Sequence, residues 1–351
     1  MMVISHYTMP VVLDALHKAV AGENLTATEA SATLEEILRG ETPAPLVASL
    51  LVALRMKGEA VEEVVGFAQA LRHHAIRVEC GLDPRPLVDT CGTGGDGAQT
   101  FNISTASAFV VAGAGARVAK HGNRSISSRC GSADVLEELG ARLDLDPERV
   151  ARCVQEVGIG FLFAPTLHPA MRHVQPIRAE LKMRTVFNLL GPLANPAGAE
   201  AQVVGVYEAR LVKLVAEALA RLGTKRAMVV HGNDGLDEIT TTGPTLAAEV
   251  VEGRVTERTL EPSAFGVARA TVTQLAGGDR RENAAIVTTV LSGENGPRRD
   301  IVLVNAAAAL CTAGVAPDLA EGILLARKSI DSGRALETLN RFVRFTRGES
   351  A

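Results

Sequence analysis

Apolar residues recur at helical spacing throughout the N-terminal part of the chain. Thr26 and Glu29 have the spacing of a capping box, in which each residue satisfies a backbone N–H of the other at the start of a helix. Two further helices are predicted over residues 44–56 and 61–75. Because no strand pattern interrupts this region, the sequence predicts a small all-helical domain over residues 1–78.

Beyond Cys80 the pattern changes to short apolar strands, each followed by a glycine-containing loop and a helix. Strands are predicted at residues 87–89, 117–119, 160–163, 202–206 and 226–230. Asp146 is expected to cap a helix that begins at Pro147, and the alanine-rich segment 305–330 is interpreted as buried helix. The alternation predicts an α/β domain over residues 79–351, with a mostly parallel central sheet flanked by helices.

Three loops follow predicted strands and contain the polar residues of interest. In a parallel sheet, ligands bind at the carboxyl ends of the strands, where all three loops are expected to lie. The first loop contains GTGGD, from Gly92 to Asp96, and matches neither a P-loop nor the GxGxxG spacing of a dinucleotide site. An ordinary glycine turn is the alternative. Hydroxyl and amide side chains follow at the start of the next helix, so the sequence favours a phosphate or pyrophosphate there.

The second loop, from Lys120 to Ser128, contains basic and hydroxyl side chains. It is either a solvated basic turn or, as the neighbour of the glycine loop in a parallel sheet, part of the same anion site. The third loop contains Asp237 and Glu238. An isolated acidic pair is usually a solvated turn, but carboxylates beside a polyphosphate are typical ligands of Mg²⁺.

Composition narrows the possible functions. The 351 residues are 47% hydrophobic, which suits two domains. The net charge of −4 and the absence of a basic block argue against nucleic-acid binding. Five widely spaced cysteines without a CxxC pair favour a reducing compartment, and we expect a cytoplasmic protein. No run of 18 uncharged apolar residues predicts a membrane span, and no signal peptide is indicated.

The ordered motifs DTCGTGGD, FNISTASA, KHGNRSISSRCGSADVLEELG, the block from HPAM to RTVFNLLGPLANP, and GLDE resemble those of the anthranilate phosphoribosyltransferases of tryptophan synthesis. The resemblance covers nearly the whole chain. It implies a homodimer whose subunits have a helical domain, completed by part of 168–195, and an α/β domain, with substrates between the two. It also implies that anthranilate and phosphoribosyl pyrophosphate (PRPP) are the substrates, with two Mg²⁺ ions per subunit.

Site residues are carried over from the resemblance position by position. PRPP is expected at Gly92, Gly95, Asp96, Thr100, Asn102, Ile103, Ser104, Thr105, Lys120, His121, Gly122, Asn123, Arg124, Ser125, Ile126, Ser127, Ser128 and Ser132. Mg²⁺ is expected at Ser104, Asp237 and Glu238, and anthranilate at Gly92, Asn123 and Arg178. A planar guanidinium matches the benzoate carboxylate in a two-bond fork. Lys182 and Cys130 depart from the family pattern, at positions without an assigned role in the chemistry.

No residue is predicted to act as a nucleophile or base. A leaving pyrophosphate held by Mg²⁺ and fixed donors departs with oxocarbenium character, so positioning and electrostatics suffice. One alternative is a pyrimidine-nucleoside phosphorylase, which the complete KHGNR and GLDE motifs disfavour. Another is a non-catalytic nucleic-acid-binding relative, for which the mildly acidic chain is unsuited.

Overall fold

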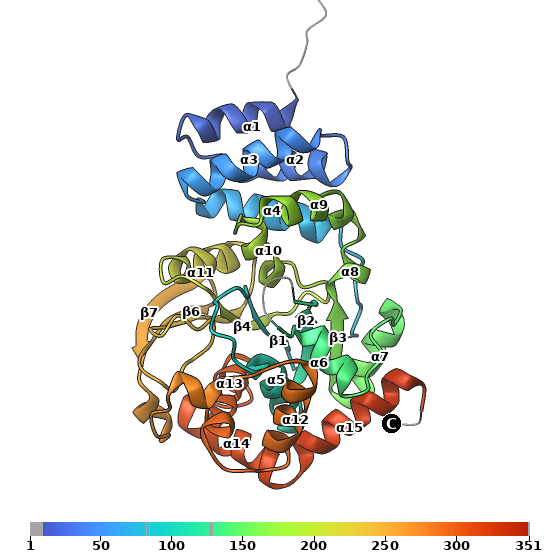
Figure 1. Cartoon of the computed structure of the whole chain (residues 1–351), viewed down its shortest axis with the longest axis vertical. Coiled ribbons are helices and arrows are strands. Elements are labelled where there is room, and N and C mark those ends of the chain that lie inside the picture. The colour runs from blue at the N-terminus through green and yellow to red at the C-terminus, as the bar shows by residue number, and fades with distance from the viewer. Residues whose placement is uncertain (1–9, 82, 84, 126–128, 350–351) are drawn as a thin grey trace, which may run out of the picture. The chain divides into compact units, whose positions relative to one another are not determined.

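A computed structural model describes residues 10–81, 83, 85–125 and 129–349 (Figure 1). Contacts divide the chain into two compact units. One consists of the N-terminal residues to Ala75 together with His168–Ala194, and the other of Ile76–Leu167 together with the chain from Asn195 onward. No helix in the described part of the chain is long and apolar enough to cross a membrane.

The first unit is all helical. Its elements are α1 (Val11–Val20), α2 (Ala27–Leu38), α3 (Ala44–Lys57), α4 (Val61–His73), the 3-10 helix η1 (Pro169–His173), α9 (Gln175–Leu181) and α10 (Phe187–Leu193). The predicted capping box begins α2: Glu29 N–H donates to the Thr26 hydroxyl at 3.2 Å, and Thr26 N–H donates to the Glu29 carboxylate at 2.9 Å. Lys57 and the fully buried Glu63 form an ion pair at 3.0 Å inside the unit.

The second unit is built on a seven-stranded sheet in the order β3-β2-β1-β4-β5-β6-β7. The strands are β1 (Leu87–Gly92), β2 (Arg117–Gly122), β3 (Ile159–Phe163), β4 (Ala201–Gly205), β5 (Arg226–Gly232), β6 (Thr245–Val251) and β7 (Arg254–Leu260). The first five pair in parallel, while β6 and β7 add an antiparallel edge. The prediction of a mostly parallel sheet is therefore confirmed.

Helices pack on both faces of this sheet, because successive strand residues point to opposite sides and both sides are apolar. They are α5 (Ile103–Gly113), α6 (Ser132–Glu138), α7 (Pro147–Val157), α8 (Ala164–Leu167), α11 (Leu211–Arg221), α12 (Arg280–Leu291), α13 (Pro297–Thr312), α14 (Leu319–Asp331) and α15 (Arg334–Arg347), with 3-10 helices η2 (Pro262–Phe265) and η3 (Val272–Leu275). On β2, Val118 joins the main core with α5 and α13, whereas Ala119 joins a smaller core with α7.

Several local predictions differ from the structure, and two of them have a clear physical reason. Segment 305–330 is not one helix: α13 ends at Thr312 and α14 begins at Leu319. The intervening Gly314 has a φ of +70°, in the left-handed region that suits glycine at the end of a helix. Strand β2 is longer than predicted and includes Lys120 and His121, because these polar residues find partners inside the fold. The predicted Asp146 cap is confirmed, with its carboxylate accepting from Arg149 N–H at 2.7 Å.

Candidate substrate and metal site

The three loops singled out in the sequence follow β1, β2 and β5, at the carboxyl edge of the parallel strands. Two hydrogen bonds join the third loop to the first loop and its helix. Gly94 N–H donates to Asp237 Oδ2 at 2.7 Å, and Ser104 N–H donates to Glu238 Oε1 at 3.1 Å. Residues separated by more than 130 positions are thus brought together, and both N–H groups are oriented toward a carboxyl oxygen.

Glycines allow this approach. A Cβ on Gly92 would lie 2.5 Å from Asp237 Oδ2, and a Cβ on Gly205 would lie 1.5 Å from the backbone oxygen of Asp237. Any side chain at these two strand ends would therefore displace the third loop, which contains Asp237 and Glu238 and is called the acidic loop below. The sequence indicated that the glycine loop approaches something closely, and for Gly92 that neighbour is Asp237. Gly205, at the end of β4, was not identified, because it stands alone in the sequence and owes its importance to a contact with the loop after β5.

The acidic loop has a strongly perturbed electrostatic environment. Withdrawal from water and the neighbouring Asp96 carboxylate raise the pKa of Asp237 to about 7. Burial first, and then the charge of Asp237, raise the pKa of Glu238 well above its ordinary value. Like charges held this close are costly without a counter-charge, so the site favours a cation. Perturbed carboxylates of this kind gather at functional sites.

Lys120 is a buried cation that interacts electrostatically with these carboxylates. Burial lowers its pKa, while Asp89 and the acidic residues of the site act in the opposite direction. Its ammonium donates to the backbone oxygen of Thr90 and to Ser104 Oγ, the latter at 3.3 Å. Lys120 therefore contacts one of the predicted metal ligands, and its side chain is turned into the protein.

The start of α5 presents both side-chain and backbone groups. Asn102 is the N-cap residue, and its amide donates to Cys130 O at 3.2 Å and accepts from Asn283 Nδ2 at 3.0 Å. Asn283 was not identified from the sequence, since nothing in α12 marks it as near the site. The side chains of Ile103 and Thr105 are buried. Positive electrostatic potential from the helix dipole adds to these donors.

The remaining residues of the first loop surround this helix end. Asp96 Oδ1 accepts from Ala98 N–H at 3.1 Å, which closes a tight turn. Thr100 forms an isolated bridge with Ala276. Gly94 and Gly95 have φ values of +65° and +74°, which glycine alone adopts without strain.

The second loop is held partly by its own acidic neighbours. Arg124 pairs with Glu137 at 2.7 Å and with Asp134 at 3.3 Å, and lies 5.4 Å from the ring centroid of Phe163. Ser132 Oγ donates to Asn123 O at 3.2 Å. His121 is buried, Gly122 ends β2, and Ser125 N–H donates to an Asp134 oxygen at 3.1 Å. Ile126, Ser127 and Ser128 lie outside the described residues.

Arg178 belongs to α9 in the helical unit. Its guanidinium lies 5.6 Å from the ring centroid of Phe187 in the same unit, and burial lowers its pKa. A guanidinium supported by an aromatic face has a restricted orientation, as recognition of a planar carboxylate requires. Gly92 and Asn123 belong to the other unit, so the shared anthranilate site stays a prediction.

The oxygen donors of the site fit Mg²⁺. Within the described ranges, no group of three or more His, Cys, Asp or Glu side chains is arranged to hold a metal by itself. Ser104, Asp237 and Glu238 offer only oxygen ligands at one helix end, and the acidic pair lacks a full protein cage. This suits Mg²⁺, which binds through one or two carboxylates and completes its shell with waters and substrate phosphates.

Asn305 of α13 was also not identified from the sequence. Its side-chain amide accepts from Ile239 N–H at 3.0 Å and donates to Ile239 O at 2.9 Å, directly after Glu238. A third bond, to Ile301 O at 2.9 Å, satisfies the amide within its own helix. The amide thus fixes the backbone that carries the two carboxylates. In the sequence Asn305 stands directly before a run of alanines, which indicates only a helix packed in the core.

Comparisons with known proteins agree with this arrangement. Residues 84–336 match the α/β domain of a glycosyl transferase family, and residues 13–75 match the helical bundle domain of that family. An anthranilate phosphoribosyltransferase from Rubrobacter xylanophilus is 57% identical over 95% of this chain and 97% of its own. The crystal structure of the Thermus thermophilus anthranilate phosphoribosyltransferase has a TM-score of 0.90 and 47% identity, covering 95% of this chain and 99% of that one. The Saccharomyces cerevisiae enzyme in complex with PRPP and Mg has a TM-score of 0.88 and 31% identity, over 98% and 99%.

Proposed function

This chain belongs to the family of anthranilate phosphoribosyltransferases, and we propose how its own residues divide the work of that reaction. The reaction transfers the phosphoribosyl group of PRPP to the amino group of anthranilate and releases pyrophosphate, in tryptophan synthesis. The observation that carries the proposal is the convergence of three loops at one sheet edge, where Gly94 and Ser104 N–H groups meet Asp237 and Glu238.

The pyrophosphate of PRPP is held by the first two loops and the start of α5. The start of α5, where the helix dipole favours an anion, and the open glycine backbone at Gly94 and Gly95 support this. The PRPP residues are those assigned from the sequence, with Ile103 and Thr105 contributing only backbone. Each charge-assisted hydrogen bond contributes about 1.5–3 kcal/mol, so several together orient the leaving group.

Ser104, Asp237 and Glu238 hold Mg²⁺, with two ions in each subunit. When bound, the metal neutralises charge that develops on the departing pyrophosphate. The chain's own part is to fix these oxygen ligands, which Asn305 does for the acidic loop through Ile239. Arg178, with Gly92 and Asn123, binds anthranilate and directs its amino group toward C1 of the ribose. No general base is assigned to the chain: the C1–O bond to pyrophosphate breaks ahead of C–N bond formation, and the proton that the amino nitrogen then releases passes to the departing pyrophosphate or to water.

The decisive experiment follows anthranilate fluorescence on mixing with PRPP and Mg²⁺, with each component omitted in turn. Fluorescence should fall only in the complete mixture, with pyrophosphate released in equal amount. Persistent fluorescence in that mixture would contradict the proposed function. Phosphorolysis of thymidine, measured in parallel, tests the nucleoside phosphorylase alternative, which the family assignment disfavours.

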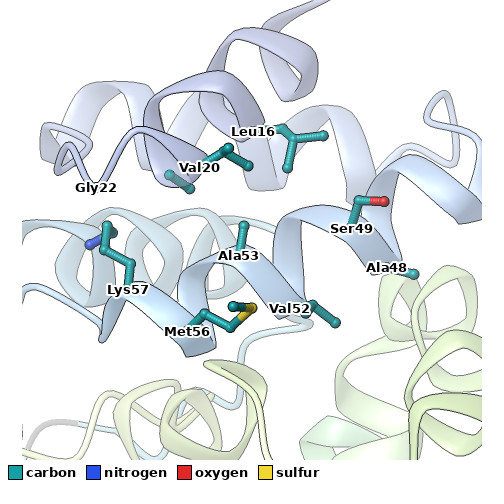
Figure 2. A pocket seen from close by; sticks show the side chains of 10 residues that line it. Leu16, Val20, Gly22, Ala48, Ser49, Val52, Ala53, Met56 and Lys57 are labelled. Atoms are coloured by element: carbon teal, nitrogen blue, oxygen red, sulfur yellow. The ribbon is translucent and has the colours of Figure 1, made fainter.

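The protein is proposed to act as a homodimer through the helical unit. Figure 2 shows an apolar pocket between α1 and α3, with a volume of about 720 Å³. It is lined by Leu16, Ala19, Val20, Gly22, Ala48, Ser49, Val52, Ala53, Met56 and Lys57. Val20 is 73% exposed and Met56 is 83% exposed. Such a grouping of exposed apolar side chains is typical of a surface that a second copy covers.

The cytoplasm is the proposed location. All five cysteines lie in the described part of the chain and are buried free thiols. Buried thiols with raised pKa, such as Cys153, are unreactive and suit a reducing compartment.

A further inference from the structure

The sheet splits between the two strands that carry the substrate loops. Strands β1 and β2 pair at Leu87 with Arg117 and at Val88 with Val118. From there β1 stays paired with β4, and β2 stays paired with β3, to the ends of both strands. The backbone groups that face the split therefore need partners other than a neighbouring strand.

Three buried polar side chains supply those partners. Asp89 Oδ1 accepts from His121 N–H at 3.1 Å, and Lys120 Nζ donates to Thr90 O. Asn195 Nδ2 donates to Ala119 O at 2.9 Å. Side-chain groups thus replace the ladder hydrogen bonds on both sides of the split.

Asp89 and Asn195 are bonded to each other and together form a bridge between β1 and β2, and both side chains are buried. Asp89 is 0% exposed, and its second oxygen accepts from Asn195 Nδ2 at 2.7 Å. The other end of the Asn195 amide accepts from Ala197 N–H at 2.9 Å, so each polar atom of this amide is used. A buried, fully satisfied network of this kind fixes geometry, because every group in it loses a partner if one moves.

We propose that Asp89 and Asn195 are positioning residues for PRPP binding, which set the separation between the first loop, after β1, and the second loop, after β2. The inference rests on the proposed function, since both loops are assigned to the same PRPP molecule. Neither residue is among those assigned to bind substrate: Asp89 acts through the backbone of His121, and Asn195 acts through the backbone of Ala119. Ligand groups must be held within about 0.5 Å of their productive positions, so a small widening of the split weakens the donor site.

The test compares Asp89→Asn, Asn195→Ala and the double variant with the wild-type protein. The Asp89→Asn change keeps the shape of the side chain but places an NH₂ against one of its two donors, His121 N–H or Asn195 Nδ2. Asn195→Ala removes the bridge to Ala119. Each single variant should raise the KM for PRPP about tenfold and change the KM for anthranilate less than about twofold. The double variant should be no worse than either single variant, because the two share one bridge.

Ser329→Ala is the matched control for a buried hydrogen bond in the same unit. Ser329 is 0% exposed, and its hydroxyl donates to Val110 O at 2.8 Å near the far end of α5. This variant should lower the thermal midpoint and leave both KM values unchanged. Hydrogen exchange supplies a readout independent of turnover: Asp89→Asn and Asn195→Ala should accelerate exchange in the peptide 119–125 and not in 226–232.

Unchanged KM values together with unchanged exchange at 119–125 would overturn the inference, as would equal increases of both KM values. If Asp89→Asn does not fold, Asn195→Ala, which keeps the carboxylate beside Lys120, tests the inference by its KM values and by hydrogen exchange in the peptide 119–125. If both fail to fold, Asn195→Ser decides it. A wild-type protein that does not consume anthranilate would instead refute the proposed function, so the two failures are distinguishable.

Discussion

At the scale of single residues, Asp237 and Glu238 show how the structure gives a short acidic pair its meaning. Asp237 accepts a backbone N–H from the first loop and Glu238 accepts one from the start of α5, and burial raises the pKa of both. A solvated turn would leave them in water at ordinary pKa values. The pair is therefore built to meet positive charge.

Asp237→Asn and Glu238→Gln should each lower kcat about 10- to 100-fold, because each removes a charged ligand contact worth about 1.5–3 kcal/mol. The measurement is initial rate as a function of Mg²⁺ concentration at saturating PRPP. Glu257→Gln, on the exposed strand β7, is the control and should behave as wild type. Wild-type rates for both variants at limiting Mg²⁺ would remove these residues from the metal site.

Arg178→Ala should raise the KM for anthranilate about 10- to 100-fold and the KM for PRPP far less, because a two-bond contact with the benzoate carboxylate is lost. Steady-state kinetics with each substrate varied in turn measure this. Arg172→Ala, on the neighbouring 3-10 helix η1, should leave both values near wild type. Equal changes in the two KM values for Arg178→Ala would refute its assignment.

At the scale of elements, the ends of strands carry more of the function than the sequence pattern indicated. The strand predicted at 87–89 ends at Asp89 and the one at 117–119 stops before Lys120, whereas β1 continues to Gly92 and β2 continues to Gly122. An apolar pattern ends where polar side chains begin, but a polar strand end is stable when its side chains are bonded inside the fold. Lys120 and Thr90 are bonded in this way.

Gly205→Ala should reduce turnover at least about 100-fold, since the added Cβ would lie 1.5 Å from the backbone oxygen of Asp237 and must push the acidic loop away. Turnover and Mg²⁺ dependence are the measurements, with circular dichroism to establish folding. Gly191→Ala, where an added Cβ meets no atom within 4 Å, is the control. A folded Gly205→Ala protein with normal turnover would show that the loop tolerates displacement.

At the scale of the whole molecule, the predicted domain limits, 1–78 with part of 168–195 and 79–351, remain a proposal. Contacts in the structure group the chain to Ala75 with His168–Ala194. The physical basis for the returning segment is visible inside the helical unit, where Arg72 Nε donates to Leu193 O at 2.6 Å. Such pairings between distant segments leave little trace in the local sequence.

The proposed dimer gives a prediction at the same scale. Val20→Glu and Met56→Glu should each convert the dimer to monomer, because either places a charge in an apolar contact surface. Analytical ultracentrifugation at micromolar concentration measures the change. Leu324→Glu, which alters a 58% exposed side chain of α14, is the control and should stay dimeric. A wild-type monomer, or dimers of all three variants, would contradict the proposed surface.

Features encoded by neighbouring residues could be predicted from the sequence. Helical periodicity, the Thr26 capping box, the Asp146 cap and the alternation of strands with helices each depend on residues within a few positions of one another. The position of each of the three loops, directly after a predicted strand, could also be predicted from neighbouring residues. The motifs carried the family resemblance for the same reason, because each is a contiguous run of residues.

The meeting of distant groups could be seen only in the folded chain. Three contacts join segments that are at least 32 positions apart in the chain. They are the hydrogen bond of Gly94 to Asp237, the close approach of Gly205 to the backbone of Asp237, and the hydrogen bonds between Asn305 and Ile239. The bridge of Asp89 and Asn195 across the split sheet is of the same kind. Isolated Asn, Asp and Gly residues have no periodicity to reveal them, and their roles arise from burial and hydrogen bonds that exist only after folding.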